Sequence, residues 1–162
     1  MAFDKFDCAS AGGAAMTTIT IDTLAYFYNQ GGRFCRPIGR SKEDMETGWT
    51  QKPYDLQAIV AHVNAGNNAG LLTGEKSANI GLFDLDRKYQ AFCKKFPRFA
   101  AFPTVYRLDA DDRAKFAFIV EDSVENISQL KSVKYKPFGE THPWFEFLWT
   151  GRYAIIPPSK HP

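Results

Sequence analysis

The sequence predicts an α+β fold in which a β-sheet carries helices on one face. The 162 residues suit one domain of ordinary size, and an apolar share of 44% is enough to form a buried core. Segments with helical periodicity are interleaved with short apolar segments that are typical of strands. Two pairs of these short segments are separated by turn-forming residues, which indicates β-hairpins and therefore antiparallel pairing.

The first half of the chain is predicted to hold two helices and one strand. Asp22 is a candidate N-cap for a helix that ends before Gly31, and a short apolar strand is expected over 33–38. Asp55 is a candidate N-cap for a second helix, which Gly66 ends. The apolar residues of this helix follow the spacing of one buried face, at Leu56, Ile59, Val60 and Val63.

The middle of the chain is predicted to hold two strands and a helix. Residues 69–73 and 79–86 are short and apolar, and their closeness in the chain favours neighbouring strands. Residues 87–95 have a helical pattern that ends before Pro97, because proline lacks the N–H that a helix requires.

The C-terminal part is predicted to be rich in β-structure, with two hairpins. The acidic residues 109–112 form the turn of the first hairpin, and Thr150-Gly151-Arg152 forms the turn of the second. A short helix is expected between them, over 123–131. The four strands of these hairpins are predicted at 104–108, 115–120, 145–149 and 153–156.

Charge, hydropathy and cysteine content exclude several classes of protein. Lys and Arg number 20 against 18 Asp and Glu, which excludes a histone-like polycation, so any contact with nucleic acid must come from a local basic patch. No apolar run approaches the ~20 residues that cross a bilayer, so no contact with a membrane is expected. The cysteines Cys8, Cys35 and Cys93 lie far apart and form no CxxC pair, so we expect free thiols in a cytoplasmic setting.

Residues 1–16 are predicted to be a flexible leader. They include a run of small residues over 9–15, and no apolar region follows a basic start, so they do not resemble a signal peptide. Met16 is a candidate start of the protein. Residues 17–162 are then predicted to form the single folded domain.

The most informative acidic residues are Asp84 and Asp86 in the segment Gly81-Leu82-Phe83-Asp84-Leu85-Asp86. Side chains alternate between the two faces of a strand, so both carboxylates are expected on one face. Two adjacent carboxylates repel each other unless a cation lies between them, and oxygen ligands at this spacing suit Mg²⁺ or Mn²⁺. The alternative is a strand that ends in solvated acids at a turn.

Glu146 is a third candidate ligand, because it lies within the apolar aromatic segment 144–149. A charged carboxylate in apolar surroundings needs a partner or a metal ion. If this strand neighbours the strand of Asp84 and Asp86, three carboxylates share one face and could hold two metal ions, as in phosphoryl transfer. The alternative is an edge strand whose glutamate faces water.

Basic residues on the predicted hairpin are candidates for binding phosphate. Lys115 and Arg113 could offset the charge of a nucleotide triphosphate beside metal ions. A lone lysine at the start of a strand is also compatible with an edge charge in solvent. In the tail, Pro157-Pro158 favours an extended segment that could position Ser159 and His161, or could serve as an ordinary surface connector.

Together these segments resemble the primase–polymerase (prim-pol) branch of the archaeo-eukaryotic primase superfamily, which occurs in plasmid, phage and mobile-element replication proteins. The similarity covers roughly residues 22 to 162, and the matching segments occur in the family's order. They are 31–38, Lys42 with Gly48-Trp49, Asn67-Asn68-Ala69-Gly70 with Thr73-Gly74, 79–86 with the DxD motif, Glu146, and the terminal signature Gly151-Arg152 to Pro157-Pro158-Ser159-x-His161-Pro162.

The resemblance implies a fold and an activity. It implies a catalytic sheet related to the RNA-recognition motif with a small N-terminal α/β module, and template-directed nucleotidyl transfer with a two-metal Mg²⁺ or Mn²⁺ site at Asp84, Asp86 and Glu146. It implies binding of dNTPs or NTPs by Lys115 and Arg113, with Ser159 and His161 lining the nucleotide pocket. Implied partners are a single-stranded or primed DNA template and a helicase module or subunit.

The sequence departs from the family in one respect. Many members have a histidine where this chain has Lys115, so priming without a primer is in question, although a lysine can still neutralise phosphate. The chain also stops where family members usually continue, so it looks like a primase–polymerase domain excised from a longer protein.

Three classes of function are therefore open. The preferred one is a DNA polymerase or primase that uses the three carboxylates. The second is a metal-dependent nuclease, in which the same carboxylates activate water, although no clear general base lies near them. The third is a non-catalytic module that binds single-stranded nucleic acid through aromatic and basic residues.

Overall fold

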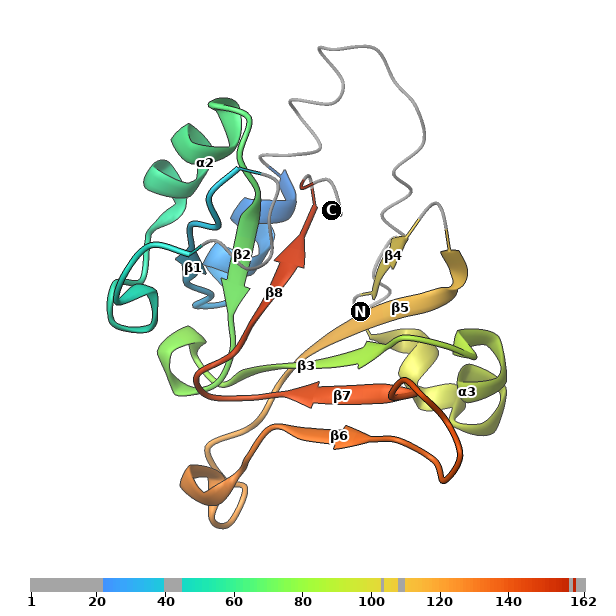
Figure 1. Cartoon of the computed structure of the whole chain (residues 1–162). Coiled ribbons are helices and arrows are strands. Elements are labelled where there is room, and N and C mark those ends of the chain that lie inside the picture. Colours follow the sequence, from blue (N-terminus) through green and yellow to red (C-terminus); the bar gives the residue numbers. More distant parts are fainter. Residues whose placement is uncertain (1–21, 40–44, 103, 108–109, 158, 160–162) are drawn as a thin grey trace.

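The chain forms two antiparallel sheets with helices packed against them, which confirms the predicted α+β class (Figure 1). This computed structural model describes residues 22–39, 45–102, 104–107, 110–157 and 159. The five-stranded sheet has the order β4 (Thr104–Arg107), β5 (Ala110–Ile119), β3 (Ile80–Leu85), β7 (Phe145–Leu148) and β6 (Val133–Tyr135). The three-stranded sheet has the order β1 (Phe34–Cys35), β2 (Ala69–Leu72) and β8 (Tyr153–Ile156).

Three predicted helices are present. They are the helix over 22–29, α2 (Leu56–Asn64) and α3 (Tyr89–Lys95). The helix predicted over 123–131 is reduced to one 3₁₀ turn, η4 (Ile127–Gln129). Three further 3₁₀ turns complete the described elements, namely η1 (Trp49–Gln51), η2 (Glu75–Ser77) and η3 (Pro97–Ala101). The predicted leader over 1–16, Cys8 and Lys42 lie outside the described residues.

The predicted N-cap of α2 is confirmed by its geometry. Asp55 has an extended backbone, and its carboxylate accepts a hydrogen bond of 2.9 Å from the backbone N–H of Ala58. This bond satisfies one of the N–H groups that the first turn of a helix leaves without a partner.

Replacing Asp55 with Ala is expected to lower the free energy of unfolding by about 1 kcal/mol, because the N–H of Ala58 loses its acceptor. Urea denaturation followed by circular dichroism measures this loss. Asp55→Ser is the matched control, since serine also caps helices and should retain most of the stability. Equal stability of the Ala variant and the wild type would contradict the capping role.

Two predicted strand pairings are wrong. β7 and β8 do not form a hairpin around residues 150–152, because β7 pairs with β3 and β6 while β8 pairs with β2. The strands β2 and β3, predicted as neighbours, likewise belong to different sheets. At both places the chain crosses from one sheet to the other instead of turning back. The predicted pairing of β4 with β5 is confirmed, but residues 110–112, which were predicted to form the turn, belong to β5.

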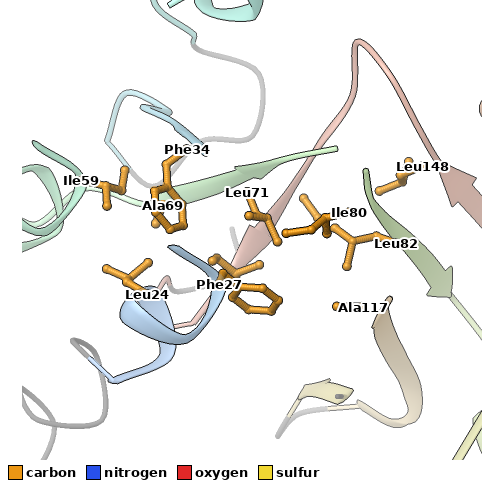
Figure 2. Packing of buried hydrophobic residues seen from close by; sticks show 12 residues of the cluster. Leu24, Phe27, Phe34, Ile59, Ala69, Leu71, Ile80, Leu82, Ala117 and Leu148 are labelled. Atoms are coloured by element: carbon orange, nitrogen blue, oxygen red, sulfur yellow. The ribbon is translucent and has the colours of Figure 1, made fainter. Parts of the chain in front are cut away.

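Helices lie on both faces of the five-stranded sheet, so the prediction of helices on one face alone is wrong. On one face, Ile80, Leu82, Ala117 and Leu148 pack with the helix over 22–29 and with the three-stranded sheet, as Figure 2 shows. On the other face, α3 covers a second cluster that includes Phe116 and Leu85. Burial of these side chains supplies the main driving force for packing the layers together.

The register of the five-stranded sheet places charged side chains next to the apolar part of the first face. Leu82 is the partner of Ala117 and Leu148, and the next residue on that face of β3 is Asp84. The apolar packing between the two sheets therefore gives way to charged side chains on the same face.

Two further observations bear on the setting of the protein. Cys35 and Cys93 are free thiols; Cys35 is buried, and this burial raises the pKa of its thiol. Among the helices that the structure describes, none combines the length and the apolar composition that a membrane crossing requires.

Candidate functional site

Two of the predicted metal ligands, Asp84 and Glu146, are direct partners on neighbouring strands. Asp84 is on β3, Glu146 is on β7, and the register pairs them across the sheet. Their side chains are only 21% and 17% exposed. The strand β7 lies between β3 and β6, so Glu146 is not on an edge strand, as one interpretation of the sequence had it. Like charges in such a pair destabilise a sheet unless cations compensate them.

Two lysines compensate this pair. Lys115 on β5 is the cross-strand partner of Asp84 and forms an ion pair with it. Lys134 on β6 is the cross-strand partner of Glu146, with 3.2 Å between the Lys134 Nζ and Glu146 Oε2 atoms. A row of alternating pairs, Lys115–Asp84 and Glu146–Lys134, thus crosses four strands. Lys115 is not an edge residue, because β5 lies between β4 and β3.

The other two predicted residues of the sheet lie outside this row. Asp86 directly follows β3, is half-buried, and donates its backbone N–H to the carbonyl of Trp144 at 3.1 Å. Arg113 lies two residues before Lys115 on β5 and is also half-buried. Within the described part of the chain, no group of three or more Asp, Glu, His or Cys residues is arranged to hold a metal ion. The structure thus brings together two of the three predicted carboxylates.

The tail residue Ser159 has a contact that fixes the backbone. Its hydroxyl accepts a hydrogen bond of 2.7 Å from the N–H of Ala69 and lies 3.3 Å from the carbonyl of the same residue, to which it donates. Ser159 therefore fastens the chain after β8 to the start of β2. His161, the second predicted residue of the tail, lies outside the described residues.

A cavity of about 450 Å³ lies over the row of charges, between the two sheets. One wall of the cavity is formed by the charged row of Asp84, Glu146, Lys115 and Lys134. The other wall is formed by Arg152, by Tyr153 at the start of β8 and by Trp49 of η1. The Trp49 ring meets the Tyr153 ring edge-on, with 5.0 Å between their centroids. The cavity is therefore polar and charged on one side and aromatic and cationic on the other.

The backbone of Arg152 is held rigidly, while its side chain is exposed. Its carbonyl accepts a hydrogen bond of 3.1 Å from the N–H of Thr73, whose hydroxyl lies at the same distance and donates to the carbonyl of Trp149 at 2.7 Å. The N–H of Arg152 donates to the carbonyl of Trp149 at 3.1 Å. Among the described residues, no acid lies within ion-pair distance of the Arg152 guanidinium. This cation is therefore available to a ligand in the cavity.

Sequence reasoning missed Lys134 and Tyr153 as parts of the site. The alternation of polar and apolar residues in Val133-Lys134-Tyr135 was a signal for a strand, but the segment is short. This strand lies beside β7 because residues 133–135 pair with residues 145–147, and the turn at 137–140 lies between the two segments. The sequence predicts Tyr153 in the second strand of a hairpin. In the structure β8 pairs with β2 in the three-stranded sheet, and this pairing places Tyr153 against the cavity.

A cluster around Glu46 fixes the segment that carries Trp49. The Glu46 carboxylate accepts hydrogen bonds from the Tyr54 hydroxyl and, at 3.2 Å, from the Arg36 guanidinium. The guanidinium lies over the Tyr54 ring, 4.0 Å from its centroid. The bond from Tyr54, helped by Arg36, lowers the pKa of Glu46, and the same bond raises the pKa of Tyr54.

Replacing Tyr54 with Phe is expected to raise the pKa of Glu46 toward the ordinary value of about 4.3, because the carboxylate loses its principal donor. A ¹³C NMR titration of the glutamate carboxyl groups measures this change. The stability that the bond adds is present above the ordinary pKa and is lost as the pH falls through the lowered pKa of the folded state. An identical Glu46 titration in both proteins would contradict this assignment.

Comparisons with known proteins add no family assignment. A scan of the chain against protein-family models finds no match, and a search of curated proteins finds none either. What the protein does must therefore be inferred from the cavity, from the charges that line it and from the motifs of the sequence.

Proposed function

We propose that the protein is a metal-dependent, template-directed nucleotidyltransferase, a DNA primase or polymerase of the primase–polymerase type from a mobile-element or phage-like replication system. In this proposal, the five-stranded sheet is the catalytic sheet of the archaeo-eukaryotic primase fold. The observation that carries the proposal is the pairing of Asp84 with Glu146 in the wall of a large polar cavity, with a lysine beside each carboxylate.

The carboxylate pair fits a divalent cation of the Mg²⁺ type. Such ions take oxygen ligands and are usually held by one or two carboxylates, with water and substrate phosphates completing the shell. Asp84 and Glu146 supply two carboxylates side by side, and Asp86 is the third candidate ligand. When bound there, Mg²⁺ or Mn²⁺ would neutralise phosphate charge and lower the pKa of an attacking hydroxyl.

The other groups of the cavity suit a nucleoside triphosphate. Lys115, Lys134 and Arg152 place three cations around a space of about 450 Å³, which lies in the range typical of small-molecule sites. Trp49 and Tyr153 offer aromatic rings to a base or a sugar. In the reaction, the primer 3′ hydroxyl loses its proton to water, its oxygen forms a bond to the α-phosphorus of the nucleotide, and the bond from this phosphorus to the bridging oxygen breaks to release pyrophosphate. Because the protein chiefly positions these groups, their rigid placement accounts for catalysis.

Primer extension tests the proposal. The protein is incubated with a labelled primer on a longer template, with dNTPs or NTPs and with Mg²⁺ or Mn²⁺, and extension that requires both nucleotide and metal is expected. A second reaction holds labelled single-stranded DNA with Mn²⁺ and no nucleotide. Degradation of the DNA in this second reaction without extension in the first would contradict the proposal and favour a nuclease.

A further inference from the structure

One edge of the five-stranded sheet carries exposed aromatic and basic side chains. The edge strand β6 has β7 as its single neighbour, which Figure 1 shows at the rim of the sheet. All three of its residues are exposed, and Phe138 in the following turn is fully exposed. We call this surface the β6 strip and define it by Lys131, Val133, Tyr135, Lys136 and Phe138. Single exposed apolar side chains are common on soluble proteins, whereas several that lie close together are typical of interaction sites.

The backbone that carries the aromatic side chains of the β6 strip is fixed by its local contacts. Phe138 lies at the corner of a tight turn, in which the N–H of Glu140 donates to the carbonyl of Pro137 at 3.2 Å and Gly139 has a φ of 82°. Glu140 is tied to Arg87 by an ion pair of 3.5 Å. The Tyr135 ring stacks on the Phe145 ring, with 5.1 Å between centroids and 19° between planes. Both exposed rings are thus presented by ordered backbone.

The charges of the β6 strip suit a polyanion. The six residues from Lys131 to Lys136 hold three lysines and no acid, although the whole chain carries a net charge of only +2. Lys134 pairs with Glu146, whereas no acid among the described residues lies within ion-pair distance of Lys131 or Lys136. Lysines that alternate with exposed aromatic rings are typical of surfaces that bind single-stranded nucleic acid, because its bases can stack and its phosphates are anionic.

We propose that the β6 strip binds single-stranded nucleic acid, with bases stacked on Tyr135 and Phe138 and with phosphates contacted by Lys131 and Lys136. A duplex would fit poorly, because its bases are already stacked on one another. Side chains alternate between the two faces along a strand, so Tyr135 lies on the face that α3 covers, stacked on Phe145, whereas Lys134 lines the cavity on the opposite face. Nucleic acid bound to the β6 strip therefore runs along the outer edge of the sheet and not within the cavity. This binding is independent of the proposed catalysis.

Fluorescence anisotropy with a labelled oligonucleotide of twenty thymidines tests this proposal, in EDTA and without nucleotide. Phe138→Ala and Tyr135→Ala are each expected to raise Kd about tenfold, with no change in its salt dependence. The double variant Lys131→Ala/Lys136→Ala is expected to reduce the slope of log Kd against log salt concentration by about 1.4, since each phosphate contact on a single strand contributes about 0.7.

The matched control is Lys94→Ala/Lys95→Ala, which removes the same charge from exposed positions on α3 and should leave the slope nearly unchanged. Phe138 is fully exposed, so its replacement should not disturb the fold. Wild-type affinity in both aromatic variants, or an equal loss of slope in the control, would overturn the proposal. Asp84→Asn should keep full binding, so loss of catalysis and loss of binding can be distinguished.

Discussion

Replacing Asp84 with Asn is expected to reduce metal-dependent nucleotide incorporation by at least about a hundredfold. Asparagine keeps the shape of the side chain but removes the negative charge, so the wall of the cavity loses one of its two paired carboxylates. The affinity for a divalent cation should fall with it. Single-nucleotide primer extension measures the rate, and titration with Mn²⁺ measures the apparent metal affinity.

Two further variants make this test specific. Glu146→Gln should reduce the rate to a similar extent, and the double variant should add little, because residues that act as a unit are not additive. Asp112→Asn is the matched control, since it makes the same chemical change at an exposed position of β5. Urea denaturation must accompany the rates, because Asp84→Asn also leaves Lys115 without its ionic partner. A stable Asp84→Asn protein that extends primers at the wild-type rate would rule out the proposed role.

Replacing Gly74 with Ala is expected to lower the free energy of unfolding by about 3 kcal/mol or more, as is typical where a strained backbone and a steric clash coincide. Gly74 has a φ of 82° and a ψ of −154°, a conformation open almost only to glycine. A Cβ atom there would lie 2.3 Å from the Thr150 hydroxyl oxygen and 2.7 Å from the Thr150 backbone nitrogen. The backbone cannot move aside as a flexible side chain would.

Gly66→Ala is the control for this prediction. Gly66 also has a positive φ, of 89°, but a Cβ atom there would meet no other atom within 4 Å. Its replacement should therefore cost only the backbone strain, about 1 kcal/mol. Urea denaturation of the two variants separates the clash from the strain. Equal losses would show that the clash with Thr150 adds nothing to the cost of replacing Gly74.

The helices could be predicted because their signals are local. Asp55, the spacing of apolar residues after it and Gly66 lie within one short segment, and together they determined α2 almost to the residue. The hairpin of β4 and β5 was predicted for the same reason. In the segment 123–131, Val124 is exposed and Ile127 and Leu130 are only half-buried, so tertiary packing does not extend the predicted helix beyond η4.

The crossings between the sheets could not be predicted, because they depend on distant partners. Thr150-Gly151-Arg152 has the composition of a hairpin turn, yet β8 pairs with β2, whose residues lie more than eighty positions earlier. The site follows the same pattern. Alternation along β3 predicted which face Asp84 occupies. Its pairing with Lys115 and Glu146 could not be predicted, because it depends on the sheet order that places β5 and β7 beside β3.

The closing of the three-stranded sheet by β8 has a consequence for how the protein forms during translation. While a ribosome is still adding residues before 153, β1 and β2 can pair with each other, but the other edge of β2 has no strand to bind. Pairings between segments that lie far apart in the sequence are slow to form and leave apolar surface uncovered meanwhile. The three-stranded sheet of the nascent chain therefore depends on β8 for its completion, and a ribosome that stalls before β8 would hold a product prone to aggregation.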